Sequence, residues 1–396
     1  MPRLAIDGGE PVREDFLVFG APQINEAEIA EVVDCMRRRW IGTGPKVHRF
    51  EEEFRAYVGA GNAVALSSCT AALRLAMLAA GIERGDEVIT TAMTFCATVN
   101  GIIHSGAVPV LADCDRDSMN ISPADIESKI TARTKAIIPV HFAGRCCEMD
   151  QIMEIADRHS LIVVEDCAHA IETEFHGKRA GLFGNFGCFS FYVTKNVITG
   201  EGGMVVTEND ELAAQIRILG LHGMSKDAWK RFSDEGFKHY QVVHAGFKEN
   251  MTDIQAAMGI HQLARVEENW KIREKIWTQY GEAFADLPCS LPLDAAAETR
   301  HAYHLYTPLI DIDTLGKSRD WVLAALTAEN IGVGVHYIPV HAHPFYQKAY
   351  DWREGDFPNA EWVGDRTLSL PLSAALSDQD VADVISAFRK VLLAGG

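Results

Sequence analysis

Seven short apolar runs between residues 63 and 207 are the strongest constraint on how this chain folds. Each run has the length of a β-strand, and most are separated by segments with helical character. Alternation of this kind predicts a mainly parallel sheet with helices on both faces. Because only a short turn joins the last two runs, we expect the final strand to be antiparallel to its neighbour. The runs are Ala63–Ser68, Glu87–Thr91, Val108–Asp113, Ala136–His141, Ile162–Cys167, Gly187–Val193 and Gly203–Thr207.

A second, smaller domain is expected after the sheet. Residues 252–286 have a long helical pattern that leads out of the first domain. Beyond it, the pattern predicts strands and helices in a mixed order, which is typical of an α+β domain. We therefore predict a large α/β domain over residues 1–262, including an N-terminal segment, and a small α+β domain over 263–396. The expected elements of the small domain are strands at 303–310 and 332–338 and helices at 319–328 and 378–393.

Two helix starts are readable directly from the residue types. Ser122 precedes Pro123, and a serine cap followed by proline at the first helical position is a common start signal. Ser377 is expected to begin the C-terminal helix in the same way.

Charge and composition exclude several classes of function. The 396-residue chain has 37 basic and 55 acidic side chains, a formal net charge of −18, which argues against binding to nucleic acid or to an anionic membrane. No apolar stretch is long enough to cross a bilayer, and the N-terminus lacks the apolar centre of a signal peptide. The nine cysteines have no paired spacing, so we expect neither a disulfide framework nor a zinc motif, and a cytoplasmic location.

The segment from Phe189 to Gly203 carries the most informative chemistry. Lys195 follows an apolar run, Ser190 lies five residues before it, and a glycine-rich turn comes after it. A lysine shielded from water has a lowered pKa and can form a Schiff base, and a serine hydroxyl can bind phosphate. The segment is therefore compatible with a lysine that carries pyridoxal phosphate. On its own it is equally compatible with a surface lysine beside a hairpin.

A carboxylate and a histidine are predicted at the same sheet edge. Asp166 lies at the end of an apolar run, where open α/β sheets bind their ligands. There it could pair with the pyridine nitrogen of the cofactor, and His169 could bond the ring hydroxyl. An aspartate in this place could also simply cap the next helix.

Three further segments fit a cofactor site, each with a structural alternative. Thr70 and Ala71 begin a helix of strong formers, whose free N–H groups suit a phosphate. Phe95 follows the second run and could stack on the cofactor ring, or lie in the core. Lys248 precedes the long helical span and could reach a phosphate, or remain on the surface.

Taken together, these segments resemble the DegT/StrS family of sugar aminotransferases. The resemblance extends from about Trp40 to Leu372. Besides the motifs above, it includes the segments at 85–89, 134–141, 222–223 and 253–257. It implies the fold type I architecture of aspartate aminotransferase, with a mostly parallel seven-stranded sheet and a smaller C-terminal α+β domain. It also implies pyridoxal 5′-phosphate as cofactor.

The resemblance assigns roles to matching residues. Lys195 would form the Schiff base with the cofactor, and Asp166 would contact its pyridine nitrogen. Phe95 would stack on the ring, and Thr70, Ala71 and Ser190 would bind the phosphate. Many family members have glutamine where this chain has His169, so the resemblance leaves the contact of His169 to the ring hydroxyl open.

A second departure concerns the segment before the long helical span. Many members have Asn-Tyr-Arg where this chain has Lys248, Glu249 and Asn250. In the family this segment reaches the phosphate of the partner subunit, which implies a homodimer with shared sites and a role for Lys248 or Asn250. The Lys-x-Asn version is similar to the aminotransferases that make UDP-4-amino-4-deoxy-L-arabinose.

The resemblance implies transamination in two halves. L-glutamate would donate the amino group, Lys195 would move the proton as a general acid and base, and a nucleotide-linked keto sugar, most often a 4-keto sugar, would accept. Amino-sugar and polysaccharide synthesis, including that of lipopolysaccharide, is the implied setting. Candidate residues for the acceptor site are Trp40, Trp229, Arg231, Tyr303, His304, His336 and Tyr337.

The sequence is also compatible with other functions. A cyclitol or aminobenzoate-type aminotransferase would use the same chemistry with another acceptor. A cofactor-binding regulator or scaffold would not need a reactive lysine, and the related sugar dehydratases have histidine in place of Lys195. No metal is expected, because His336, His341 and His343 have no carboxylate or cysteine at ligand spacing.

Overall fold

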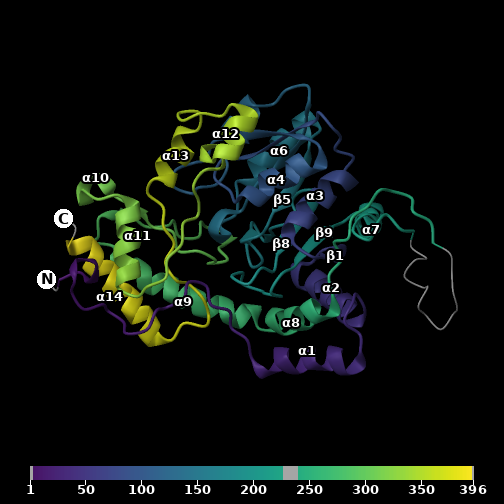
Figure 1. Ribbon diagram of the computed structural model, residues 1–396. Coiled ribbons are helices and arrows are strands. Elements are labelled where there is room, and N and C mark those ends of the chain that lie inside the picture. Colours follow the sequence, from purple (N-terminus) through teal and green to yellow (C-terminus); the bar gives the residue numbers. More distant parts are fainter. Residues whose placement is uncertain (1–2, 226–239, 395–396) are drawn as a thin grey trace.

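The computed structural model describes residues 3–225 and 240–394 and has a seven-stranded sheet at its centre (Figure 1). Its strand order is β1-β9-β8-β5-β4-β2-β3. The four pairings among β8, β5, β4, β2 and β3 are parallel, whereas β9 is antiparallel to both β8 and β1. The predicted mainly parallel sheet and its antiparallel last strand are therefore confirmed. The strands are β1 Asn62–Leu66, β2 Glu87–Thr91, β3 Val108–Ala112, β4 Thr134–Ile138, β5 Ile162–Asp166, β8 Phe186–Ser190 and β9 Gly203–Thr207.

Helices cover both faces of this sheet. Val205 and Val164 pack on one face with α3 and α7, while their neighbours Val206 and Val163 pack on the other face with other helices. Because successive side chains of a strand point to opposite faces, strands buried on both sides have continuous apolar sequences. The helices around the sheet are α1 Glu26–Arg38, α2 Pro45–Val58, α3 Cys69–Ala79, α4 Cys96–Ser105, α5 Pro123–Ser128, α6 Met149–His159, α7 Asp210–Leu219 and α8 Asp253–Ala264.

A second apolar core lies at the end of the molecule that holds both termini (Figure 1). Most of its side chains come from three helices, at residues 266–284, 319–328 and 378–394, and Leu4 near the N-terminus packs with them. Leu17 also pairs with Ile331, so the N-terminal segment packs on this second core. The boundary at residues 262 and 263 remains a prediction. The elements after the sheet are α9 Val266–Phe284, β10 Cys289–Ser290, β11 Thr299–Arg300, β12 Leu309–Ile310, α10 Ile312–Leu315, α11 Arg319–Ala328, α12 Pro344–Tyr350, α13 Pro358–Gly364 and α14 Asp378–Ala394.

The predicted helix starts are present. The Ser122 hydroxyl accepts a hydrogen bond from the backbone N–H of Asp125 at the start of α5. The Ser377 hydroxyl accepts one from the N–H of Asp380 at the start of α14 (3.1 Å). Both are serine caps that satisfy a free N–H of the first turn.

The long helical span predicted over 252–286 is wrong in one respect, because it consists of two helices. Arg265 separates α8 from α9 with φ −111° and ψ 11°, outside helical geometry. Helix α8 packs on α1 and α2 beside the sheet, and α9 continues into the second core. Because of the break, the apolar residues before Arg265 pack beside the sheet and most of those of α9 pack in the second core.

Two predicted strands of the small domain are mostly absent. In residues 303–310 only Leu309–Ile310 forms a strand, and Tyr303 has a left-handed backbone (φ 48°) that interrupts any longer one. In residues 332–338 a single bridge joins Gly334 to Ser369. The Ser369 hydroxyl also bonds the ring of His336, so this contact is made by side chains and does not extend the strand pairing.

Short elements complete the chain. Strands β6 Glu174–Phe175 and β7 Lys178–Arg179 form a small sheet with β11. The 3-10 turns are η1 Ala5–Asp7, η2 Phe142–Gly144 and η4 Val340–Ala342. Among the described residues, no helix combines the length and the apolar composition required to cross a membrane.

Candidate active site

The main candidate residues meet at the carboxyl edge of the parallel strands. Asp166 is the last residue of β5, and Ser190 is the last residue of the neighbouring β8. Lys195 follows β8 in a turn closed by a hydrogen bond from its own N–H to the carbonyl of Tyr192 (2.9 Å). Adjacent parallel strands bring their carboxyl ends to one edge, so residues distant in sequence converge there.

The environment of Lys195 favours its neutral amine. The side chain is partly buried, and this loss of solvent lowers its pKa from 10.5 to about 8. The negative charge of Asp166 acts in the opposite direction but does not cancel the effect. At neutral to mildly alkaline pH, a substantial fraction of the amine is therefore unprotonated, which is the form that attacks a carbonyl.

Asp166 is a buried carboxylate held by two donors. Its Oδ2 accepts a hydrogen bond from the Thr98 hydroxyl (2.8 Å), and its Oδ1 accepts one from the N–H of Ala168 (3.1 Å). Burial raises its pKa, while these two bonds and the charge of Lys195 lower it. Within residues 3–225 and 240–394, no salt bridge joins Asp166 to a cationic side chain. A cationic ligand group placed here would gain a fixed, desolvated counter-charge.

His169 is held in one tautomer. Its Nδ1 lies 3.2 Å from the N–H of Ala143, which can only donate, so Nδ1 is unprotonated. The proton is then on Nε2, which donates to the Tyr337 hydroxyl at 3.1 Å. Burial and the charge of Lys195 lower the pKa of His169 well below its ordinary value, so the ring is neutral. In this structure the Nε2–H of His169 is therefore engaged with Tyr337, one of the predicted acceptor-site residues.

The expected phosphate-binding groups lie close together. Ser68 caps α3, accepting from the N–H of Ala71 (3.1 Å), and Thr70 lies in the first turn of the helix. Ser190 pairs with Gly203 across the sheet. A Cβ on Gly203 would lie 2.4 to 2.5 Å from backbone atoms of Ser68 and Cys69, so this glycine allows the strand to touch the start of the helix. Ser190 is thereby placed beside the helix N-terminus, which is a favourable place for an anion.

Two aromatic rings flank the site. Phe95 immediately precedes α4 and is 57% exposed, a large exposure for a phenylalanine. Its ring centroid lies 5.9 Å from that of Tyr337. A planar ligand could therefore stack on Phe95 without displacing core residues.

The segment containing Lys248 and Asn250 lies beside the start of α3. The carbonyl of Glu249 accepts a hydrogen bond from the N–H of Ser67 (2.7 Å). The Lys248 amine bonds the side-chain oxygen of Asn250, whose amide nitrogen in turn bonds the Thr43 hydroxyl. The segment is thus near the expected phosphate site of its own chain, and its contact with a partner's phosphate remains a prediction.

Three of the residues predicted for the acceptor site gather near Lys195. The His304 ring centroid lies 4.5 Å from that of His169, and Tyr337 bonds the same histidine. His336 bonds the Ser369 hydroxyl at 2.7 Å, and burial together with the charge of Lys195 lowers its pKa to about 3. His304 and His336 are therefore neutral hydrogen-bonding groups at physiological pH.

Two other predicted acceptor residues, Tyr303 and Trp40, lie elsewhere in the described part of the chain. Tyr303 is packed in the second core against Trp270 and Trp277, with ring centroids 5.7 and 5.1 Å away. Trp40 is 52% exposed on the loop between α1 and α2. Trp229 and Arg231 lie outside the described residues. Roles for these four residues in acceptor binding remain predictions.

Two residues important to the geometry were not singled out from the sequence. Thr98 orients Asp166 from the first turn of α4, and nothing in its local sequence distinguishes it from other threonines. Asn196 follows Lys195 directly, and this adjacency was the available signal. Its contacts depend on residues far away in the sequence.

A buried cluster of His141, Glu165 and Cys167 brings three possible metal ligands within 4.8 Å of one another. Glu165 already accepts three hydrogen bonds, from His141 Nε2 and from the N–H groups of Gly181 and Gly184. Two members of the cluster, Glu165 and Cys167, are the chain neighbours of Asp166, and the hydrogen bonds of Glu165 connect this part of the sheet to the turn at residues 181–184.

Comparison with known proteins agrees with this geometry. Residues 22–389 match the DegT/DnrJ/EryC1/StrS aminotransferase family. The chain is 49% identical to the spore coat polysaccharide biosynthesis protein SpsC of Bacillus subtilis (strain 168), over 96% of this chain and 98% of SpsC. Among solved structures, the putative sugar aminotransferase Spr1654 of Streptococcus pneumoniae in its PLP form superposes with a TM-score of 0.90 at 31% identity, covering 96% of this chain and 100% of Spr1654.

DesI, solved in the presence of its TDP-sugar product, has a TM-score of 0.88 at 32% identity and covers 99% of this chain and 97% of its own. The fold and site thus define a fold type I aminotransferase that depends on pyridoxal phosphate. The chain belongs to the DegT/DnrJ/EryC1/StrS aminotransferase family, whose structural relatives are sugar aminotransferases.

The residues present fit pyridoxal phosphate. Lys195 supplies an amine with a lowered pKa for the aldehyde, and Asp166 is a desolvated carboxylate without a cationic partner in the described residues, as a protonated ring nitrogen requires. The start of α3 and the adjacent Ser190 suit the phosphate. Phe95 offers an exposed aromatic face for the ring.

The lowered pKa of Lys195 predicts a pH dependence for cofactor capture. Only the neutral amine attacks the aldehyde, so the rate at which the apoprotein captures pyridoxal phosphate should rise with pH through a midpoint near 8. Stopped-flow absorbance between pH 6 and 11 measures this midpoint. Lys195→Ala serves as the control and should show no capture. A midpoint near 10.5, the ordinary value for lysine, would contradict the desolvated environment.

Proposed function

We propose that this protein transfers the amino group of L-glutamate to a nucleotide-linked keto sugar whose ketone is at carbon 4. The observation that carries the proposal is the partly buried Lys195 amine, with its pKa of about 8, placed at the same sheet edge as Asp166. The relationship to SpsC, named for polysaccharide biosynthesis, and to DesI, solved with a TDP-sugar product, supports a nucleotide-sugar acceptor.

Lys195 acts as both base and acid in this proposal. Pyridoxal phosphate, when bound, supplies an electron sink that stabilises negative charge on the carbon attached to the transferred nitrogen. Once released from the cofactor, the Lys195 amine can take the proton from the α-carbon of the amino donor and return it on the cofactor side. A pKa of about 8 suits both directions near neutral pH.

The surrounding side chains bind and orient. Asp166 holds its negative charge in place through Thr98 and Ala168. Neutral His304 and His336, together with Tyr337, offer hydrogen-bonding groups to a sugar or to a donor carboxylate. Because these rings are already fixed by protein contacts, ordering them on binding costs little conformational entropy.

A two-step absorbance experiment tests the function. The cofactor-loaded protein should lose its visible band when L-glutamate is added and regain it when a nucleotide-linked 4-keto sugar is added. Lys195→Ala, which has no amine to form the Schiff base or to carry the proton, should show neither change in absorbance. If a keto cyclitol restores the band and none of the nucleotide-linked sugars does, the acceptor is a cyclitol and the proposed acceptor class is wrong. A band that ignores every amino donor would favour a regulator or scaffold.

We also propose that the protein is a homodimer with shared active sites. Several large apolar side chains are exposed in the single chain, as a partner-covered surface requires. They are Phe95 (57%), Ile41 (55%), Trp40 (52%) and Tyr192 (44%). Asn250 and Lys248 lie close to this surface through Thr43.

The dimer makes a simple prediction about mass. Analytical ultracentrifugation at micromolar concentration should give one species of twice the 43.6 kDa chain mass. A single species at the chain mass that retains full transamination activity would exclude shared sites.

A further inference from the structure

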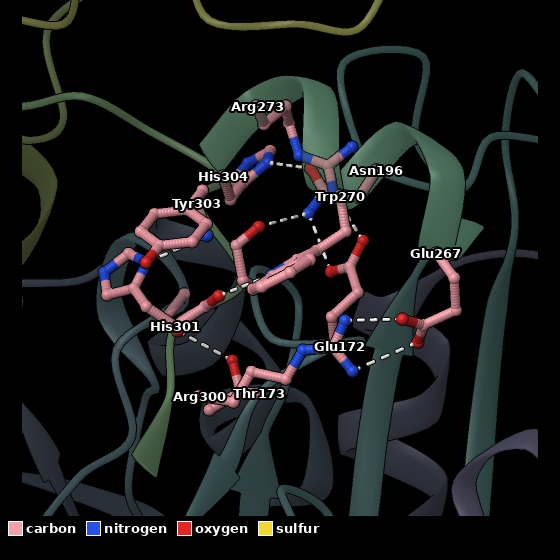
Figure 2. Close-up of polar contacts among 12 residues, drawn as sticks. Glu172, Thr173, Asn196, Glu267, Trp270, Arg273, Arg300, His301, Tyr303 and His304 are labelled. Atoms are coloured by element: carbon pink, nitrogen blue, oxygen red, sulfur yellow. Dashed lines mark hydrogen bonds and ion pairs between the residues drawn. The ribbon is translucent and has the colours of Figure 1, made fainter. Parts of the chain in front are cut away.

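The side chain of Asn196, the residue after Lys195, uses both of its donors and its acceptor in partly buried contacts (Figure 2). Its Nδ2 donates to Glu172 Oε2 (2.8 Å) and to the carbonyl of Ala302 (3.1 Å). Its Oδ1 lies 3.0 Å from Nδ1 of His304. The two acceptors on one side fix which end of the amide is nitrogen. Asn196 is therefore locked in a single orientation.

Glu172 and Arg273 form a buried ion pair behind this amide. Glu172 is 0% exposed and Arg273 is 3% exposed, and the guanidinium of Arg273 bonds Glu172 Oε1 at 2.5 Å. Burial raises the pKa of Glu172, whereas Arg273 and Asn196 lower it. A buried carboxylate of this kind is stable only while its partners remain in place. Since Arg273 lies on α9, the pair connects the Lys195 turn to the helix that enters the second core.

The same contacts fix the protonation of His304. Asn196 Oδ1 is an acceptor, so His304 Nδ1 must carry the hydrogen. Burial and the charge of Lys195 lower the pKa of His304 well below its ordinary value, and the ring therefore has one hydrogen only. Its Nε2 is left as an acceptor, next to the His169 ring.

Direct packing around the Lys195 turn is incomplete. Lys195, Asn196 and Arg273 line one small cavity, together with Gln262 of α8, Asn269 of α9 and the segments 20–23 and 372–375. Across a cavity, side chains provide few van der Waals contacts that could hold the backbone. The polar connection through Asn196 and Glu172 therefore spans a region where apolar packing is weak.

We propose that Asn196 is a positioning residue for Lys195, fixing the turn that carries the amine by anchoring it to the Glu172–Arg273 pair and to His304. The proposal extends the aminotransferase activity and depends on neither the donor nor the acceptor. Lys195 must bind the cofactor, leave it and return during each turnover, so its backbone has to stay in place while its side chain moves. A displacement of about 1 Å at a reacting group can cost up to about 10²-fold in rate.

The test uses cofactor capture by the apoprotein, which requires neither L-glutamate nor a sugar. Asn196→Ala should slow the capture of pyridoxal phosphate by about 10-fold or more. It should also move the pH midpoint of capture upward from about 8 toward 10.5, because a loosened turn admits water to the Lys195 amine. Stopped-flow absorbance across the pH range measures both quantities.

Tyr280→Phe is the matched control. Tyr280 lies on the same helix α9, is 0% exposed, and donates one buried hydrogen bond to the carbonyl of Pro371 (2.9 Å). Loss of this hydrogen bond should lower the melting temperature while leaving the rate of cofactor capture and its pH midpoint unchanged. If Asn196→Ala behaves like Tyr280→Phe, with lower stability but an unchanged midpoint, the positioning role is refuted.

A second variant keeps the test decisive if Asn196→Ala does not fold. Glu172→Gln preserves the shape of the side chain but offers a single oxygen to both Asn196 and Arg273. It should move the pH midpoint in the same direction by a smaller amount, and an unchanged midpoint would overturn the proposal. If the wild-type protein captures the cofactor but ignores L-glutamate, the proposed function fails while the positioning role is still measured by these variants.

Discussion

The desolvation of one amine is the constraint on which this site depends. A lysine in water has a pKa too high to act as a nucleophile or a base at neutral pH, and burial of Lys195 lowers that value to about 8. Burial of a charge is unfavourable, so the fold must hold the amine where water would otherwise reach it. The sheet edge, the turn after β8 and the contacts of Asn196 all contribute to that placement.

Around this amine the protein places one carboxylate and several neutral histidines, each held by its own hydrogen bonds. Asp166 is held as a carboxylate by Thr98 and Ala168, ready for a cationic ligand group. His169 and His304 are kept neutral by burial, and each has its single hydrogen fixed by a backbone or amide partner. The site thus offers one strong negative charge and several directed dipoles, a preorganised environment of the kind that stabilises developing charge.

Much of the fold could be predicted because a strand buried on both faces of a sheet has a continuous apolar sequence. Each of the seven strands appears as an apolar run, and the short turn before Gly203–Thr207 indicated an antiparallel strand. The break at Arg265 could not be predicted, since no glycine or proline stands there and the apolar pattern continues across it. In residues 303–310, the left-handed backbone of Tyr303 arises from tertiary packing and has no local signal. The cofactor residues came from motifs at strand ends, whereas Glu172 and Arg273 are 101 residues apart and only the folded chain shows that they pair.

The central claim is that Lys195 is the amine that binds the cofactor. Borohydride reduction of the protein loaded with pyridoxal phosphate, followed by proteolysis and peptide mass spectrometry, locates that amine directly. We expect a stable pyridoxyl group on the peptide that contains Lys195 and on no other lysine. A modification on a different lysine, or a protein that binds the cofactor without any reducible bond, would contradict it.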